Sequence, residues 1–212
     1  MKSGDKASLK KPFENQFLEY GHTNYLIHVP PMFHHCTLNN FDFSDQKPSL
    51  IKAIKNFLEG TGKKKGLFLY GSFGIGKTHL LVAMYRATVK KEEDPSESFA
   101  FFTSLENIMK EVFKRIDKKD RDLDSPAEYL EFLSEIQWLF LDDITATPLK
   151  DYTLEVLRKI INTRYEMQLP TCFAANSDLE QLVADGLHPH AISRITGMCE
   201  VIKIQGRDRR RL

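Results

Sequence analysis

The sequence predicts an α/β protein built on a parallel five-stranded sheet that is flanked by helices. Short apolar runs, typical of buried strands, recur along the chain and alternate with segments whose apolar residues follow a helical spacing. This alternation indicates a parallel sheet covered by helices on both faces. A glycine-rich loop also stands between the first apolar run and the helix after it, as in proteins that bind phosphate groups. Neither an internal repeat nor a second compact domain is visible in the sequence.

The predicted strands are the apolar runs themselves. In chain order they cover residues 66–70, 99–102, 138–141, 171–175 and 201–204. In the first predicted helix Leu50, Ile54 and Phe57 share one face, and Gly60 ends it. The predicted helices cover residues 46–59, 77–91, 104–116, 126–135, 151–167, 178–185 and 191–196, and a charged loop covers 117–125.

Less regular structure is predicted before the first helix. Residues 1–12 are rich in lysine and serine, and residues 13–29 carry scattered aromatic side chains that are suited to covering a neighbouring surface. The segment Val-Pro-Pro-Met-Phe at 29–33 is expected to be extended, because a proline biases the residue before it away from the helical region. We therefore divide the chain into a partly disordered N-terminal extension at 1–28 and a core at 29–212.

Composition and charge exclude several classes of protein. The 212 residues include 30 lysines and arginines against 29 aspartates and glutamates, a formal net charge of +1. Without an overall basic field, any contact with nucleic acid must rest on local patches. No stretch is long and apolar enough to span a bilayer, and the three cysteines are isolated, which favours a reducing cytosol over a disulfide framework. We expect a cytoplasmic protein without membrane contact.

Residues 71–78, Gly-Ser-Phe-Gly-Ile-Gly-Lys-Thr, fit the phosphate-binding pattern G-x-x-x-x-G-K-[ST]. Glycines let the backbone turn so that N–H groups converge on phosphate oxygens at the positive end of the next helix. Lys77 is expected to reach the β- and γ-phosphates, and the Thr78 hydroxyl is expected to bind Mg²⁺. The pattern therefore predicts an ATP–Mg²⁺ site. Its expected nucleotide contacts are Gly71, Ser72, Phe73, Gly74, Ile75, Gly76, Lys77, Thr78 and His79.

A further acidic group beside the magnesium is expected from a neighbouring strand. Residues 139–141 are apolar and lead into Asp142 and Asp143, so both carboxylates stand where ligands of open α/β sheets bind. Asp142 is the expected Mg²⁺ partner, and Asp143 is expected to polarise the attacking water as a general base. The alternative is a strand-end acid that caps the next turn, because such acids are common turn residues.

Two more polar residues follow the later strands. Asn176 comes directly after the strand at 171–175, where it is suited to hydrogen-bond the γ-phosphate or the water, but Asn-Ser-Asp is equally a helix N-cap sequence. Arg194 offers a guanidinium on the short helix at 191–196, and an arginine supplied by a neighbouring subunit stabilises transition-state charge in phosphoryl transfer. A surface salt bridge is the alternative for Arg194.

Taken together, these motifs resemble those of AAA+ ATPases, and within them those of the DnaC/DnaI helicase loaders and the IstB transposition ATPases. The resemblance rests first on residues 71–78 and on Leu-Asp-Asp-Ile at 141–144, and it extends over roughly residues 29–211. It implies an AAA+ P-loop NTPase fold with little or no separate lid domain. The roles it implies are Walker A and B for Lys77, Thr78 and Asp142, the catalytic acid for Asp143, the sensor for Asn176 and the finger toward a neighbouring subunit for Arg194.

The sequence departs from the family pattern at three positions. Asp143 stands where most AAA+ proteins have glutamate, so its carboxylate is one methylene shorter and slow hydrolysis is expected. Met32 replaces the usual arginine. Arg209 replaces the usual tyrosine near the end of the chain, which leaves Arg207 and Arg210 without an assigned role.

The function implied by the resemblance is that of an ATPase that loads or remodels a replicative DNA helicase. It would bind ATP and Mg²⁺, contact single-stranded DNA, self-associate through the ATP site and Arg194, and turn over slowly unless its partner or DNA stimulates it. A helper ATPase for a transposase and a nucleotide-gated binding module with negligible turnover are the alternatives. A small-molecule kinase would need an arginine-rich lid, whereas residues 117–126 contain one arginine.

Two short basic clusters are candidate contacts for single-stranded DNA. One is Lys63 to Lys65, and the other is the set of arginines at 207 and 209–211. Phosphate contacts come from such side chains. A solvated loop and a mobile tail are the alternative, because short charge runs are usually solvated.

Overall fold

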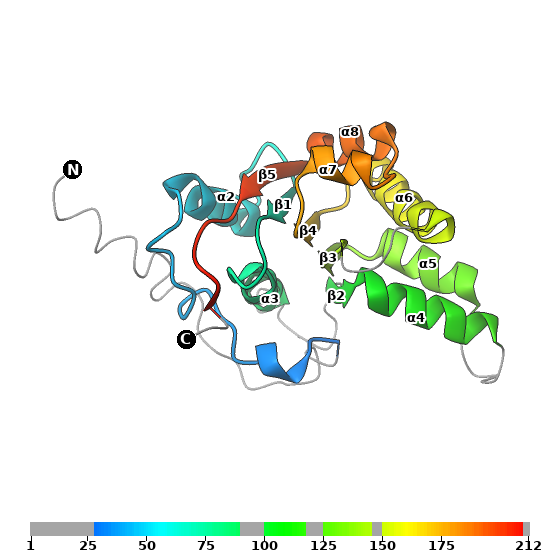
Figure 1. The fold of residues 1–212 in the computed structure, drawn as a ribbon, viewed down its shortest axis with the longest axis horizontal. Helices are drawn as coiled ribbons and strands as arrows, with labels where there is room; N and C mark the ends of the chain where they lie inside the picture. The colour runs from blue at the N-terminus through cyan, green and yellow to red at the C-terminus, as the bar shows by residue number, and fades with distance from the viewer. Residues whose placement is uncertain (1–27, 90–99, 118–124, 146–149, 210–212) are drawn as a thin grey trace, which may run out of the picture.

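The computed structural model describes residues 28–89, 100–117, 125–145 and 150–209. These residues form a five-stranded sheet in the order β2-β3-β4-β1-β5, with every neighbouring pair parallel (Figure 1). The strands are β1 (Gly66–Tyr70), β2 (Ala100–Ser104), β3 (Trp138–Asp142), β4 (Thr171–Ala175) and β5 (Cys199–Lys203). The helices are α2 (Pro48–Glu59), α3 (Lys77–Val89), α4 (Leu105–Ile116), α5 (Pro126–Glu135), α6 (Asp151–Glu166), α7 (Leu179–Ala184) and α8 (Pro189–Met198). The predicted parallel five-stranded sheet is confirmed.

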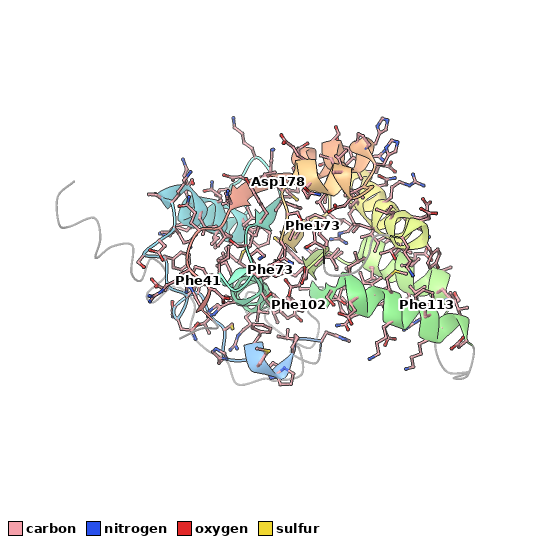
Figure 2. All side chains as sticks on the ribbon, in the orientation of Figure 1. Phe41, Phe73, Phe102, Phe113, Phe173 and Asp178 are labelled. Atoms are coloured by element: carbon pink, nitrogen blue, oxygen red, sulfur yellow. The ribbon has the colours of Figure 1, made fainter. Side chains whose placement is uncertain are left out.

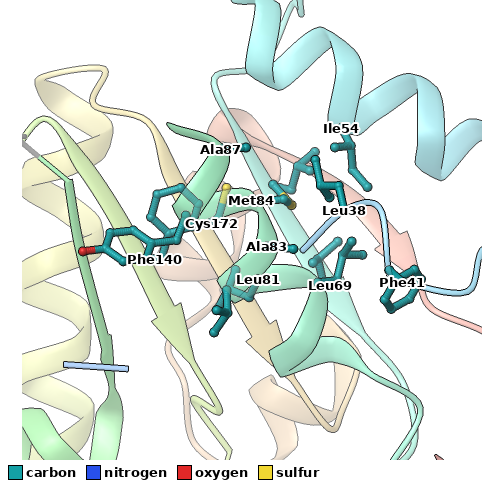
Figure 3. Packing of buried hydrophobic residues seen from close by; sticks show 14 of the residues in the cluster. Leu38, Phe41, Ile54, Leu69, Leu81, Ala83, Met84, Ala87, Phe140 and Cys172 are labelled. Atoms are coloured by element: carbon teal, nitrogen blue, oxygen red, sulfur yellow. The ribbon is translucent and has the colours of Figure 1, made fainter. Parts of the chain in front are cut away.

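Side chains that alternate along the strands divide the core into two halves. In β1, Leu67 and Leu69 pack with α2 and α3, while Phe68 between them packs with α4, α5, α6 and α8. Figure 1 shows these two groups of helices on opposite faces of the sheet. Figure 3 shows Leu69 together with Ala83 and Met84 of α3 among the residues of the first half. Both faces of the central strands are therefore covered, which explains why their sequences are continuously apolar.

The register of the central strands brings their carboxyl ends to one edge of the sheet. Tyr70 at the end of β1 pairs with Ala175 at the end of β4, and Leu141 of β3 pairs with Phe173 of β4. The segments that follow β1, β3 and β4 therefore begin side by side at that edge. This edge carries the residues that the sequence analysis singles out.

Several predicted boundaries are wrong, and proline explains two of them. Pro31 to Phe33 form a 3-10 turn instead of an extended segment, because the fixed φ of Pro31 is compatible with that turn; only Pro30, at ψ 136°, stays extended. The last helix begins at Pro189, two residues before the predicted start at 191, with His188 as its N-cap. The last strand begins at Cys199, two residues before the predicted start.

The described residues form one five-stranded sheet and its flanking helices. Among them no helix has both the length and the apolar character needed to cross a bilayer. The aromatic residues at 13–27 and most of the charged loop at 118–124 lie outside the described part of the chain.

Candidate nucleotide-binding site

The glycine-rich loop connects β1 to α3 at the carboxyl edge of the sheet. Gly74 and Gly76 adopt φ values of +76° and +99°, a region that L side chains rarely enter. At Gly76 a Cβ would also stand only 3.0 Å from the ring of Phe41. The side chain of Phe73 is 65% exposed at the loop (Figure 2). The glycines are therefore needed where the pattern puts them, both for backbone conformation and for close packing.

The Lys77 side chain is buried and folds back over the loop. Its ammonium donates hydrogen bonds to the carbonyl oxygens of Gly71 (2.8 Å) and Ser72 (2.7 Å). It also lies 5.9 Å from the centre of the Phe73 ring. A charged phosphate oxygen is a stronger acceptor for an ammonium than a carbonyl is, so a phosphate in this loop would compete well for these donors.

The predicted magnesium ligands lie next to each other. The hydroxyl of Thr78 at the start of α3 donates a hydrogen bond of 3.2 Å to Asp142 Oδ1 at the end of β3. Burial raises the pKa of Asp142 to about 6, against the opposing effect of the Thr78 hydrogen bond. A divalent cation would favour the charged carboxylate, and a hydroxyl beside a carboxylate is the oxygen donor set that Mg²⁺ takes in proteins. The residues present fit a Mg²⁺ site.

The side chains of Asp143 and Asn176 share a hydrogen bond, and Thr145 bonds to both residues. The amide of Asn176 donates to Asp143 Oδ1 at 2.8 Å, and the Thr145 hydroxyl donates to the same oxygen at 3.1 Å. The Thr145 hydroxyl also accepts the backbone N–H of Asn176 at 3.0 Å. Asp143 itself has a φ of +43°, an uncommon conformation for a residue other than glycine. The helix N-cap expected from Asn-Ser-Asp is Asp178, so Asn176 is not the cap.

Thr145 is a site residue that the sequence reasoning missed. A hydroxyl two residues after the paired acids was the available signal, since threonine and aspartate side chains commonly bond across such turns. The turn-capping alternative for Asp143 is thus partly correct, because Asp143 accepts from Thr145 within its own turn. Its contact with Asn176 on the next strand exceeds that local role.

The site is bordered by two segments that lie far apart in the sequence. His79 Nε2 lies 2.9 Å from Asn40 Oδ1, and its ring packs edge-on against Phe41. From the other end of the chain, the Arg209 guanidinium donates to the carbonyl of Asp42 at 2.8 Å and lies 4.9 Å from the centre of the Phe41 ring. These contacts place His79 and Arg209 against the same segment, which borders the glycine-rich loop at Gly76.

The segment at 204–209 also lies directly on the glycine-rich loop. The N–H of Arg209 donates to the Gly74 carbonyl at 3.0 Å, and the Asp208 carboxylate fills the space that a Cβ on Gly74 would take. Ile204 continues the sheet direction by donating to the Tyr70 carbonyl at 2.8 Å. Arg209, which departs from the family pattern, therefore lies beside the glycine-rich loop.

Arg194 makes its contacts on its own chain, with α6. Its guanidinium donates to the Asn162 side chain and forms an ion pair of 3.1 Å with Glu166. The guanidinium also lies 5.8 Å from the centre of the Tyr165 ring. The salt-bridge alternative for Arg194 therefore describes the contacts of the single chain. A role toward a neighbouring subunit remains a prediction.

Comparison with known families identifies one family model that matches most of the chain. The family model described as IstB-like ATP binding protein matches residues 22–212. The replicative helicase loader DnaI of Bacillus subtilis (strain 168) is 30% identical over 151 residues, which are 69% of this chain and 45% of that protein. The chain thus spans about half the length of this curated relative.

Solved structures agree on the fold. A crystal structure of DnaI aligns with a TM-score of 0.67 at 24% identity, over 85% of this chain and 94% of that one. A replication initiator DnaA bound to AMPPCP and single-stranded DNA aligns with the same TM-score and identity, over 84% of this chain and 51% of that one. At such identities the likeness concerns the fold, which is that of P-loop AAA+ domains.

Proposed function

This chain belongs to the DnaC/DnaI/IstB family of AAA+ ATPases, and we propose that it binds ATP with Mg²⁺ and helps to load a replicative DNA helicase. One observation carries the proposal. The glycine-rich loop, the Thr78–Asp142 pair and the Asp143–Asn176 pair meet at the same edge of the sheet. Phosphate cradle, metal ligands and a water-orienting pair are the parts that nucleoside triphosphate hydrolysis requires.

In this proposal each residue at the edge has one task. The backbone N–H groups of residues 73–78 and the Lys77 ammonium bind the phosphates, for which Lys77 leaves its two carbonyl acceptors. Thr78 and Asp142 hold Mg²⁺. Bound ATP supplies the phosphoanhydride that is cleaved, and Mg²⁺ neutralises charge on its oxygens. Asp143, fixed by the Asn176 amide, orients the attacking water and accepts its proton.

Arg194 has the proposed task of reaching the ATP site of a neighbouring subunit. Its guanidinium would exchange Glu166, a partly exposed partner, for phosphate oxygens of that subunit. Exposed ion pairs contribute little free energy, so breaking this one costs little. Self-association would then depend on nucleotide, because ATP would lie between the two subunits.

The proposed partners are a replicative DNA helicase and single-stranded DNA, in the cytoplasm. The likeness to helicase loaders and to a DNA-bound initiator supports this choice. A helper role for a transposase is the second candidate, since the matching family model carries the IstB name. We further propose that turnover is slow until a partner or DNA is present, and that the ATPase core begins near residue 29 after an N-terminal extension.

The first test of the proposal is nucleotide binding by Lys77→Ala. Removal of one charge-assisted contact to phosphate should weaken the affinity for a fluorescent ATP analogue at least about thirtyfold, or about 2 kcal/mol. Lys52→Ala, an exposed lysine on α2, is the matched control and should bind like the wild type. If a folded Lys77→Ala protein keeps wild-type affinity, the site is not a nucleotide site.

The second test concerns the client. Purified chain is mixed with the replicative helicase, and separately with a transposase, from the same source, with ATP, with ADP and without nucleotide. Nucleotide-dependent co-elution with the helicase supports the loader role. Co-elution with the transposase alone would replace the loader by the transposition helper.

A further inference from the structure

Two adjoining hollows lie at the edge of the sheet opposite the nucleotide site. Their volumes are about 360 and 380 Å³, and both are lined by Lys64, Lys65, Gln168 and Leu169. They open where β1, β3 and β4 begin, whereas the glycine-rich loop follows the end of β1. We call the two hollows together the lysine groove. It contains Lys63 to Lys65, a candidate DNA contact by sequence, and no residue of the described glycine-rich loop lines it.

The lysine groove carries an excess of positive charge. Lys63, Lys64 and Lys65 are all exposed and stand on the turn between α2 and β1. Among the described residues that line the two hollows, Glu166 is the one acid, and Arg194 already pairs with it at 3.1 Å. Three ammonium groups beside one compensated carboxylate are suited to bind a chain of phosphates.

Aromatic and amide groups accompany the lysines. The ring of Tyr165 is 42% exposed, Met167 is 51% exposed, and the Trp138 indole lines the second hollow. Gln137 and Gln168, whose side chains carry amides, line the same hollow. Exposed rings stack with unpaired bases, and amides hydrogen-bond their edges. The combination of lysines, exposed rings and amides therefore matches a single strand better than a duplex, whose bases are not available for stacking.

We propose that the lysine groove binds single-stranded DNA, with Lys63, Lys64 and Lys65 on successive phosphates and Tyr165 stacked on a base. The proposal rests on the proposed function, which includes DNA as a partner, and it assigns that partner to a surface.

The groove is also connected to the helix that carries Arg194. The Lys64 ammonium donates to the Thr196 carbonyl of α8, and the Tyr165 ring lies 5.8 Å from the Arg194 guanidinium. The same ring is in tight contact with Gly197, where a Cβ would stand 2.8 Å from it. DNA that moves Lys64 or Tyr165 therefore acts on α8. This is a physical route by which DNA in the groove can change the position of Arg194.

The test measures the affinity of the full chain for a fluorescein-labelled oligothymidylate by anisotropy at several salt concentrations. In Lys63→Ala/Lys64→Ala/Lys65→Ala the affinity should fall at least tenfold at low salt. The slope of log K against log salt should become shallower by about 2, since each lost phosphate contact on a single strand contributes about 0.7. Tyr165→Ala should lose about tenfold in affinity with an unchanged salt slope, because stacking releases no counterions.

The control variant removes the same charge elsewhere. Lys47→Ala/Lys52→Ala/Lys159→Ala takes away three exposed lysines that do not line the groove, and it should keep most of the affinity. Equal loss in both triple variants would overturn the proposal, since binding would then follow net charge. If Lys64 proves necessary for folding, Lys63→Ala/Lys65→Ala keeps its bond to Thr196 and should shift the salt slope by about 1.4.

Three further outcomes would overturn the proposal. The first is that the wild-type protein does not bind the oligonucleotide. The second is that Lys110→Ala/Phe132→Ala, on α4 and α5, abolishes DNA binding while the groove variant binds normally. The third is that the groove variant still binds DNA but no longer self-associates. ATP affinity is measured on each sample, and the groove variant should keep it. Loss of DNA binding with normal ATP affinity therefore separates a failure of the groove from a failure of the nucleotide site.

Discussion

Arg164 on α6 is the one fully buried charge among the described residues, and its replacement should destabilise the protein strongly. Its guanidinium donates five hydrogen bonds, none of them to a carboxylate. Burial lowers the pKa of Arg164 to about 10, so the side chain remains charged at neutral pH. The acceptors are the carbonyl oxygens of Leu133, Ile136, Gln137 and Pro170 and the hydroxyl of Thr171.

The magnitude follows from which acceptors water can reach after Arg164→Met. The bonds to Ile136, Gln137 and Pro170 are partly buried, so those carbonyls regain water. The bonds to Leu133 and Thr171 are buried, and an acceptor left unsatisfied there costs about 1–3 kcal/mol. Because Thr171 keeps a bond to Leu169, we expect a loss of about 3 kcal/mol in the free energy of unfolding. For a chain of this size, that lowers Tm by about 6–12 °C.

The assay is urea unfolding followed by circular dichroism, with thermal melting alongside. The control is Arg158→Met, which lies on the same helix and pairs with Glu155 at 2.6 Å in an exposed position. That change should cost far less than Arg164→Met, because exposed ion pairs contribute little to stability. Arg164→Lys should lose nearly as much stability as Arg164→Met, since an ammonium has three donors for five acceptors. If Arg164→Met unfolds like Arg158→Met, the buried network does not stabilise the fold.

Four further outcomes are expected at the nucleotide site. Asp143→Asn should bind ATP nearly normally but hydrolyse it slowly in a phosphate-release assay, and loss of binding there with retention in Asp142→Asn would reverse the two roles. Asp142→Asn should weaken the Mg²⁺-dependent part of ATP affinity, measured as the difference between titrations with Mg²⁺ and with EDTA. Because the pKa of Asp142 is raised to about 6 and the cation needs the charged carboxylate, the Mg²⁺-dependent part of the ATP affinity should be present above pH 6 and decline as the pH falls through 6. If this part of the affinity stays constant from pH 7.5 to about 5, Asp142 is not the ligand. A mixture of the inactive Arg194→Ala and Lys77→Ala proteins should recover part of the ATPase activity, because some subunit interfaces then pair an intact loop with an intact arginine. If mixed oligomers form but stay inactive, Arg194 acts within its own subunit.

The sequence predicts the central strands of the sheet well because they are buried on both faces. Such strands are continuous apolar runs, and residues such as proline mark their boundaries, as Pro170 does directly before β4. The helix at 126–135 is predicted to the residue, since Ser125 and Glu128 form a capping box around Pro126. The glycine-rich loop and the paired acids are likewise local patterns. These features need no knowledge of distant contacts.

What the sequence does not predict depends on contacts between distant residues. Thr145 reaches Asn176 across a strand crossover, and Arg209 packs on Phe41, far away in the chain. Arg164 is misleading for another reason. It follows Ile160 and Ile161 at helical spacing on the buried face of α6, but arginines are almost never fully buried, so its residue type argues against its position. The contacts of Thr145 and Arg209 follow from tertiary packing, which composition and periodicity do not encode.

The segment after α8 has a consequence for biosynthesis. β5 is the strand that covers one side of β1, and Arg209 is the residue that ties the segment at 204–209 to the glycine-rich loop and to Asp42. β5 and the segment at 204–209 leave the ribosome after the rest of the described chain. Until they emerge, β1 keeps an unpaired edge that is able to associate with other nascent chains. The glycine-rich loop therefore gains these contacts only after β1, β3 and β4 have been synthesised, and we expect ribosome-bound chains that end before residue 199 to retain ATP less well than longer chains.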